Sequence, residues 1–226
     1  MSGGTLSRSV EDYLKVIYGL CESGDPASTT AIAETLDIQP ASVTGMVKRL
    51  AESGLVEHVP YRGVRLTKRG SREALRVLRR HRILETYLCE RLGYSWDDVH
   101  GEAERLEHAA SDDLIEKMAA ALAFPRHDPH GAPIPTVSGD IESLGASTLA
   151  DATPGARVRI RAVRDEDSAH LRSMAAEGLV PGVRVRVAKA QRVAGAVEII
   201  LGADEAESRA VEGSLARQIY VVPDEA

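Results

Sequence analysis

The 226-residue sequence has only two cysteines and no C-x-x-C pair. Cys21 and Cys89 each fall in a helical apolar pattern, where a cysteine is usually a small buried side chain. A disulfide-stabilised fold is therefore not expected.

Long apolar runs are also missing. No stretch approaches the roughly 20 residues that a transmembrane helix needs, and the opening residues, MSGGTLSRSVEDY, lack the apolar centre of a signal peptide. We therefore expect a cytoplasmic protein that does not contact a membrane. The 43% of apolar residues can build real cores, and the length suits one large domain or a few small ones.

The common catalytic motifs are absent as well. The sequence contains no H-E-x-x-H, no G-x-S-x-G and no P-loop. A hydrolase that uses a metal-bound water as its nucleophile is the enzyme class to weigh against a binding protein here. Without such a motif, an enzyme is not expected.

The charge is distributed unevenly along the chain. A net charge of −6 argues against a general nucleic-acid binder, but residues 46–82 contain eleven lysines and arginines against three glutamates. Such a local excess of positive charge suits contact with phosphate groups.

Apolar spacing in the first third predicts a DNA-reading fold. Residues 7–21, 30–36 and 40–53 have helical patterns, with a turn at 37–39 and proline at the start of the third helix. Two short strands, 55–59 and 64–67, follow around the basic turn PYRG. This order predicts a winged helix-turn-helix, in which the second helix of the pair enters the major groove. The alternative is a helical hairpin followed by an unrelated β-hairpin.

The rest of the chain predicts a helical region followed by a β-rich block. We expect one helix from Ser71 to Leu92, a second that begins after a cap at Ser95, and a third from Ser111 to Leu122. A Pro/Gly-rich connector is expected from Phe124 to Thr153. The remaining residues suggest a small SH3-like barrel, with short strands at 156–163, 183–188, 197–201 and 217–222. The fold class is α+β.

A His/Glu-rich run after Ser95 is the main candidate for chemistry. On a helix, four potential metal ligands share about a quarter of the circumference: His100, Glu104, Glu107 and His108. The first and last are about 12 Å apart along the axis, so two sites are expected if both histidines bind metal. A solvated acidic face is the alternative. His127 and His130 in the connector are expected to be exposed.

These motifs together resemble the diphtheria-toxin-repressor family of iron- and manganese-dependent bacterial transcription regulators, over nearly the whole chain. The matching segments are SVEDYLxxIY from Ser9, PASVTxMVKRLxxxGLV from Pro40, RHRxxE from Arg80, HxEAxxxEHxxSD from His100 and GxPIP from Gly131. The resemblance implies a homodimer with a winged helix at 1–72, a helical dimerisation and metal-binding domain at 73–142 and an SH3-like, FeoA-like domain at 143–226.

The resemblance also implies two metal sites in each subunit. The primary site would take Asp12, Glu104, Glu107 and His108. The ancillary site would take His81, Glu85 and His100, joined by Asp167 and His170 from the SH3-like domain. For Asp167, an ordinary helix cap is the alternative.

Ligand chemistry then separates the metals. Iron-type members have methionine and cysteine where this chain has Asp12 and Glu104, and hard oxygen donors with one imidazole suit Mn²⁺. Fe²⁺ is the alternative ion. Short manganese-type members have a carboxylate where this chain has Lys15, so a closely spaced pair of ions is not expected here.

The implied function is metal-dependent repression of metal-uptake genes. Metal that joins Asp12 to the dimerisation domain would favour the DNA-competent arrangement, and a symmetric dimer would read a pseudo-palindromic operator. Gln39, Ser42 and Thr44 are candidates for base edges, and Lys48, Arg49 and Arg62 for phosphate. A metal-independent winged-helix regulator is the remaining alternative.

Overall fold

A computed structural model describes residues 6–22, 24–145, 147–164, 168–190, 196–201 and 208–224. The chain divides into two compact units. The first contains Met1–His81, Leu106–Ala110 and Pro135–Asp140, and the second contains Arg82–Arg105, Ser111–Ile134 and Ile141–Ala226. Each unit is described by itself.

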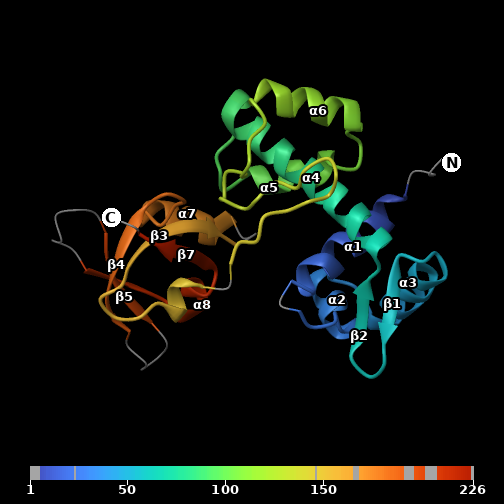
Figure 1. Cartoon of the computed structure of the whole chain (residues 1–226), viewed down its shortest axis with the longest axis horizontal. Helices are drawn as coiled ribbons and strands as arrows, with labels where there is room; N and C mark the ends of the chain where they lie inside the picture. Colours follow the sequence, from blue (N-terminus) through green and yellow to red (C-terminus); the bar gives the residue numbers. More distant parts are fainter. Residues whose placement is uncertain are drawn as a thin grey trace. The chain divides into compact units, whose positions relative to one another are not determined.

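The first unit contains the winged helix-turn-helix (Figure 1). Its helices are α1 (Arg8–Leu20), α2 (Thr29–Thr35) and α3 (Pro40–Glu52), followed by the antiparallel wing strands β1 (Val56–Val59) and β2 (Gly63–Leu66). The apolar faces that the sequence pattern predicts meet in one core, in which Leu14, Ile17, Ile32, Leu50 and Leu55 are almost completely buried. Burial of these side chains holds the three helices and the wing together.

A long helix follows the wing. Helix α4 (Lys68–Leu92) passes from the first unit into the second. In the second unit come α5 (Val99–Leu106) and α6 (Asp112–Ala121). The hydroxyl of Ser111 caps α6 by accepting from the backbone N–H of Leu114 at 3.2 Å.

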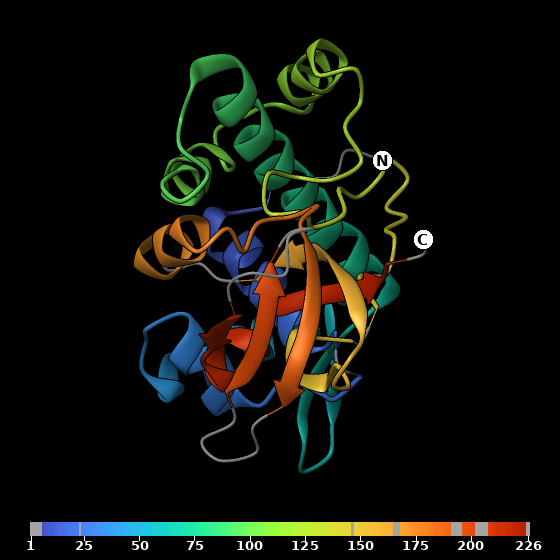
Figure 2. The same cartoon turned by 90° about the vertical axis from the view of Figure 1, so that its left-hand side faces the viewer.

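The C-terminal part of the second unit is a curled antiparallel sheet (Figure 2). The strands are β3 (Arg157–Val163), β4 (Arg184–Ala190), β5 (Val197–Leu201), β6 (Ser208–Val211) and β7 (Ile219–Pro223), in the order β6-β5-β4-β3-β7. Three short helical segments accompany them: η1 (Leu149–Asp151), α7 (Ser168–Ala176) and α8 (Gly213–Ala216). The core contains the buried residues Leu149, Ile160, Leu171, Met174 and Leu179. The predicted fold class, α+β with a winged helix and a small SH3-like barrel, is confirmed.

The GAPIP segment packs against strand β3. The backbone N–H of Val163 donates to the carbonyl oxygen of His130 at 2.9 Å. Gly131 has a φ of +83°, and a Cβ at this position would lie 2.1 Å from the carbonyl oxygen of Arg161. Only glycine permits both this backbone conformation and this approach, which explains why the segment begins with glycine.

Three local expectations were wrong. Helix α5 begins at Val99 and ends at Leu106, so Glu107 and His108 lie in the turn after the helix and do not continue one helical stripe. The Ser95 hydroxyl lies 3.4 Å from the carboxylate of Asp98 and does not cap the helix. His130 is 7% exposed, not solvated. The sequence patterns also did not indicate β6.

No helix in the described part of the chain is both long and apolar enough to cross a membrane.

Candidate metal centres

Three of the four predicted primary ligands converge in the first unit. Asp12 comes from α1, and Glu107 and His108 come from the turn after α5. Nε2 of His108 lies 2.8 Å from Oδ1 of Asp12 and 3.3 Å from Oε1 of Glu107. The side chains of Glu107 and His108 are 0% and 8% exposed, whereas that of Asp12 is 30% exposed. The cluster is therefore buried on one side and open at Asp12.

The protonation of His108 makes this cluster suitable for a cation. Nδ1 lies 2.7 Å from Oε2 of Glu11, and an ionised carboxylate only accepts hydrogen bonds, so Nδ1 carries the proton in the neutral ring. Nε2 then presents a lone pair, and this buried nitrogen makes no hydrogen bond within the described residues. Neither carboxylate can donate to Nε2, so a proton on this nitrogen or a bound cation must lie between them.

Glu11 is the residue that sequence reasoning missed. It is 6% exposed, and its Oε1 accepts a hydrogen bond from Arg80 at 2.6 Å. Arg80 and Glu11 thus form a buried ion pair that holds the carboxylate against His108, in the manner of residues that orient metal ligands from behind. No residue pattern marked Glu11, although it is adjacent to Asp12.

Glu107 is fully buried between two donors. Oε2 accepts from Nδ1 of His81 at 2.6 Å, and Oε1 accepts from Nζ of Lys15 at 2.8 Å. Burial alone would raise the pKa of Glu107, but the hydrogen bond from His81 and the charge of Lys15 hold this pKa below its usual value. Glu107 is therefore a buried anion whose two oxygens are held by Lys15 and His81.

Predicted ancillary ligands meet in the second unit. Nδ1 of His100 lies 3.1 Å from Oε1 of buried Glu85, and its Nε2 lies 3.8 Å from Oε1 of Glu104. The carboxylate of Glu104 belongs to the second unit, and Asp12 belongs to the first. The assignment of Glu104 to the same ligand set as Asp12 remains a prediction.

Two further buried side chains, those of Asp128 and His130, lie near Glu85 in the second unit. Nδ1 of His130 lies 4.0 Å from Oε2 of Glu85, and Nε2 donates to the carbonyl oxygen of Trp96 at 2.7 Å. Asp128 accepts backbone N–H groups from His130 and Ala132, each at 2.9 Å. Burial and the nearby charge of Glu85 raise the pKa of Asp128 to about 6. Asp128 thus supports the backbone of the connector at residues 130–132, while the His130 ring packs against Trp96.

Of the two ligands predicted from the SH3-like domain, the structure describes only His170. Asp167 lies outside the described residues. His170 is an exposed residue in the first turn of α7. Their role as ancillary ligands remains a prediction.

The predicted DNA contacts lie on the helix-turn-helix and the wing. Gln39 precedes α3, and Ser42, Thr44 and Lys48 are exposed along α3. The guanidinium of Arg49 contacts Sδ of Met46 at 3.3 Å. Arg62, at the tip of the wing, forms an exposed ion pair with Asp25 at 2.7 Å. This pair costs little to break, so Arg62 can turn towards a phosphate.

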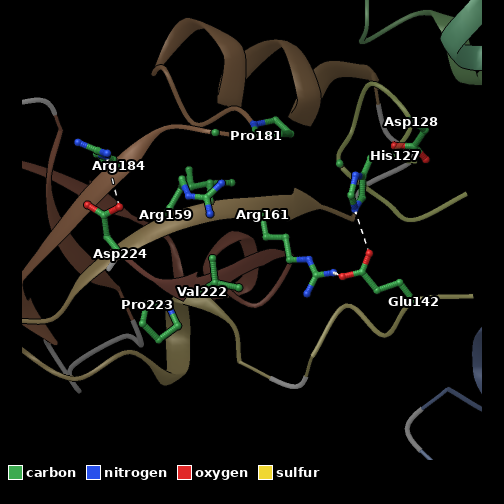
Figure 3. A pocket seen from close by; sticks show the side chains of 13 residues that line it. His127, Asp128, Glu142, Arg159, Arg161, Pro181, Arg184, Val222, Pro223 and Asp224 are labelled. Carbon is green, nitrogen blue, oxygen red and sulfur yellow. Dashed lines mark hydrogen bonds and ion pairs between the residues drawn. The ribbon is translucent and has the colours of Figure 1, made fainter. Parts of the chain in front are cut away.

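A groove of about 1000 Å³ also lies in the second unit, along β3 and β7. Figure 3 shows Arg161 and His127 directed towards Glu142, at 2.6 and 3.6 Å, and Arg184 directed towards Asp224, at 3.3 Å. These charged side chains neutralise one another, so the groove does not resemble a catalytic or metal site.

Three protein families match consecutive stretches of the chain. Residues 5–64 match the N-terminal DNA-binding domain of iron-dependent repressors, and residues 67–136 match their metal-binding and dimerisation domain. Residues 147–223 match the FeoA domain.

Individual relatives include a helix-turn-helix transcriptional regulator and an iron-dependent repressor. The HTH-type transcriptional regulator MntR of Oceanobacillus iheyensis is 36% identical over 120 residues, which cover 53% of this chain and 81% of MntR. The iron-dependent repressor IdeR of Mycobacterium tuberculosis is 37% identical over 127 residues, which cover 56% of this chain but only 55% of IdeR.

One solved structure matches along almost its whole length. A manganese-dependent transcriptional repressor in complex with manganese has a TM-score of 0.89 and 38% identity, and the match covers 95% of this chain and 99% of that one. Together with the order of domains and the cluster around His108, these matches show that the chain belongs to the diphtheria-toxin-repressor family of metal-dependent, DNA-binding transcriptional repressors.

Proposed function

We propose that this chain is a Mn²⁺-activated cytoplasmic repressor of metal-uptake genes. The observation that carries the proposal is the position of Nε2 of His108, a buried nitrogen without a hydrogen-bond partner among the described residues, which lies 2.8 Å from Asp12 and 3.3 Å from Glu107. An imidazole and two carboxylates are hard or borderline donors, and among the described residues the group that joins Asp12, Glu107 and His108 contains no cysteine. Such a set favours Mn²⁺ over softer ions.

Fe²⁺ is the second candidate. The match to an iron-dependent repressor supports it, and Fe²⁺ accepts the same oxygen and imidazole ligands. Metal availability in the cell, rather than the ligand set alone, would then select the ion.

The proposed activation couples the first helix to the dimerisation domain. Asp12 lies on α1 of the DNA-binding domain, whereas Glu107 and His108 follow α5. A bound divalent ion would supply the positive charge that allows Asp12 and Glu107 to lie against the same imidazole nitrogen. When Asp12 and Glu107 lie together in this way, α1 is fixed, and the population of the DNA-competent arrangement rises.

We further propose two ions in each subunit. The second set would contain His81, Glu85 and His100, with Asp167 and His170 from the SH3-like domain. In a homodimer, two winged helices would then place α3 in successive major grooves of a pseudo-palindromic operator.

Two measurements test the proposal together. Equilibrium dialysis with Mn²⁺, Fe²⁺ under anaerobic conditions and Co²⁺ would give the number and affinity of bound ions. Gel-shift assays on DNA upstream of metal-uptake genes, with and without each ion, would give the dependence of DNA binding on metal. Metal-independent DNA binding, or hydrolysis of a substrate on addition of metal without any DNA binding, would contradict the proposal.

A further inference from the structure

The outward face of strands β3 and β4 carries a cluster of arginines. Side chains alternate between the two faces of a strand, so the residues on either side of the buried Val158, Ile160 and Val185 point away from the core. We call this cluster the arginine face; it contains Arg157, Arg159, Arg161, Arg184 and Arg186. Residues 147–223 as a whole contain eleven arginines and lysines against ten aspartates and glutamates. The domain is therefore nearly neutral, and its charges are unevenly placed.

Like charges lie directly opposite each other across these two strands. In the antiparallel register, Arg157 pairs with Arg186 and Arg159 pairs with Arg184. Side chains at such positions have Cβ atoms about 4.5–5.5 Å apart, and like charges there destabilise a sheet. Stability of the sheet does not explain this arrangement, and residues that act against local stability are typical of functional surfaces.

Two of the five arginines are engaged by carboxylates of the same unit. Nη2 of Arg161 lies 2.6 Å from Oε1 of Glu142, and Nε of Arg184 lies 3.3 Å from Oδ1 of Asp224. The side chain of Arg184 is 74% exposed, so its pair is open to solvent and contributes little to stability.

Arg157 and Arg159 are available to an external ligand. Both side chains are exposed, and neither makes an ion pair or a hydrogen bond with a described residue. Figure 3 shows Arg159 on β3 between Arg161 and Arg184. An anion that binds here would also relieve the repulsion between the opposed arginines.

The extent of the arginine face suits an extended polyanion. Residues two apart on a strand are separated by about 6.6–6.8 Å, so the outward side chains from Arg157 to Arg161 span about 13 Å. A single small anion contacts only part of that row. The planar guanidinium donates two parallel hydrogen bonds to a phosphate or a carboxylate. A nucleic-acid backbone and an acidic protein segment are therefore the ligand classes that fit.

We infer that the arginine face is a second DNA contact, which holds phosphate groups of duplex DNA without reading the bases. DNA is favoured over an acidic protein because the same chain carries the winged helix-turn-helix. Once that domain is bound, phosphates of the same duplex are present at high local concentration. Phosphate contacts add affinity but no sequence information. This contact requires that the chain binds DNA, but it does not depend on which metal activates the chain.

Replacement of Arg157 and Arg159 together by Gln tests the contact, because it removes two positive charges from the face. Fluorescence anisotropy of the full chain with Mn²⁺ and a long duplex of random sequence would measure binding over a range of salt concentrations. The slope of log affinity against log salt should fall by about two, one for each lost phosphate contact, and affinity at low salt should fall by about tenfold or more. The melting temperature without DNA should not fall, since the replacement also removes both like-charge pairs.

Replacement of the same two residues by Glu separates a DNA contact from a structural role. An acid would then lie opposite each arginine of β4, and cross-strand pairs of opposite charge stabilise a sheet. The melting temperature without DNA should therefore rise, while DNA binding weakens further than in the Gln variant. A structural role for Arg157 and Arg159 predicts a lower melting temperature in both variants.

The double variant Lys117→Gln/Arg217→Gln is the control, since it removes two charges from exposed residues elsewhere in the second unit. It should keep the wild-type slope. A slope in Arg157→Gln/Arg159→Gln equal to that of the control would overturn the inference. Unchanged DNA binding together with lost binding of poly-L-glutamate would also overturn it and would make an acidic protein the occupant.

Two further outcomes separate this contact from the proposed function. If the Glu variant does not fold, as judged by far-ultraviolet circular dichroism, the slope and melting temperature of the Gln variant decide the matter. DNA binding by the wild type that does not respond to metal would overturn the proposed function alone. A wild-type chain that binds no duplex, with or without metal, would overturn both.

Discussion

Oε2 of Glu11 lies 2.7 Å from Nδ1 of His108, while the other oxygen of the same carboxylate accepts a hydrogen bond from Arg80 at 2.6 Å. In the neutral ring, this arrangement places the imidazole proton on Nδ1 and leaves the lone pair of Nε2 facing Asp12. We therefore propose that Glu11 orients His108 as a metal ligand by contacting the ring nitrogen that does not face Asp12.

Substitution of Glu11 by Ala should weaken Mn²⁺ binding by about 10- to 100-fold, because partners that orient a metal ligand typically contribute this much. Isothermal titration calorimetry would measure the affinity. Glu34→Ala, which removes an exposed carboxylate on α2, is the control and should bind Mn²⁺ normally. Wild-type affinity in Glu11→Ala would mean that the contact with His108 has no role in metal binding.

Substitution of His108 by Ala should abolish metal-dependent DNA binding while the protein remains dimeric. The imidazole is the nitrogen ligand of the proposed primary centre, whereas the dimer is expected to rest on apolar helix faces. Gel shifts with Mn²⁺ and sedimentation would measure the two properties. His127→Ala removes a more exposed histidine and should behave as the wild type. Mn²⁺-dependent DNA binding that survives in His108→Ala would exclude this centre as the activating one.

Replacement of Asp12 by Met should move the metal preference towards softer ions, because a thioether replaces a hard oxygen. The ratio of Co²⁺ to Mn²⁺ affinity should therefore rise relative to Asp12→Asn, which keeps an oxygen donor. Adding Glu104→Cys should raise the ratio further if Glu104 shares the ion with Asp12. Competition dialysis would give both ratios. An effect of Asp12→Met that equals that of Asp12→Asn would argue that Asp12 does not touch the metal.

Replacement of Lys48 or Arg62 by Ala should weaken binding to all DNA sequences alike. Each replacement that removes a lysine or arginine from a phosphate should also reduce the slope of the salt dependence by about one. Both residues are exposed, on α3 and at the tip of the wing. Fluorescence anisotropy over a range of salt concentrations would measure the slope, with Lys117→Ala as a charge-matched control. Slopes equal to that of the control would remove this surface from the DNA interface.

Substitution of His170 by Ala should raise the Mn²⁺ concentration needed for half-maximal DNA binding without abolishing it. The reason is that His170 is proposed to serve the ancillary ion, whereas Asp12 links the primary ion to the DNA-binding domain. Activation curves and the ion count per subunit would be compared with those of Arg172→Ala, a neighbour on α7. An unchanged curve with an unchanged count would exclude His170 as a ligand.

Much of the fold is determined by local sequence. The apolar spacing of residues such as Leu14, Ile17 and Leu50 reflects which face of each helix is buried, and Pro40 marks the start of α3. Helix ends were harder to predict where no strong signal exists. The segment from Ser95 to Asp98 has a plausible cap, yet α5 begins only at Val99, because a cap that contributes about 1 kcal/mol does not by itself fix where a helix begins.

The candidate ligands were predicted from residue type and family resemblance, but their partners were decided by the tertiary structure. Nothing in the spacing indicates that Glu11 meets Arg80 and His108, or that Lys15 meets Glu107, because 69, 97 and 92 residues separate these pairs. Helical and strand periodicity report only which face is buried. Which charges meet on that face depends on how α1, α4 and the turn after α5 pack together, because buried charged groups must be paired with one another to be stable.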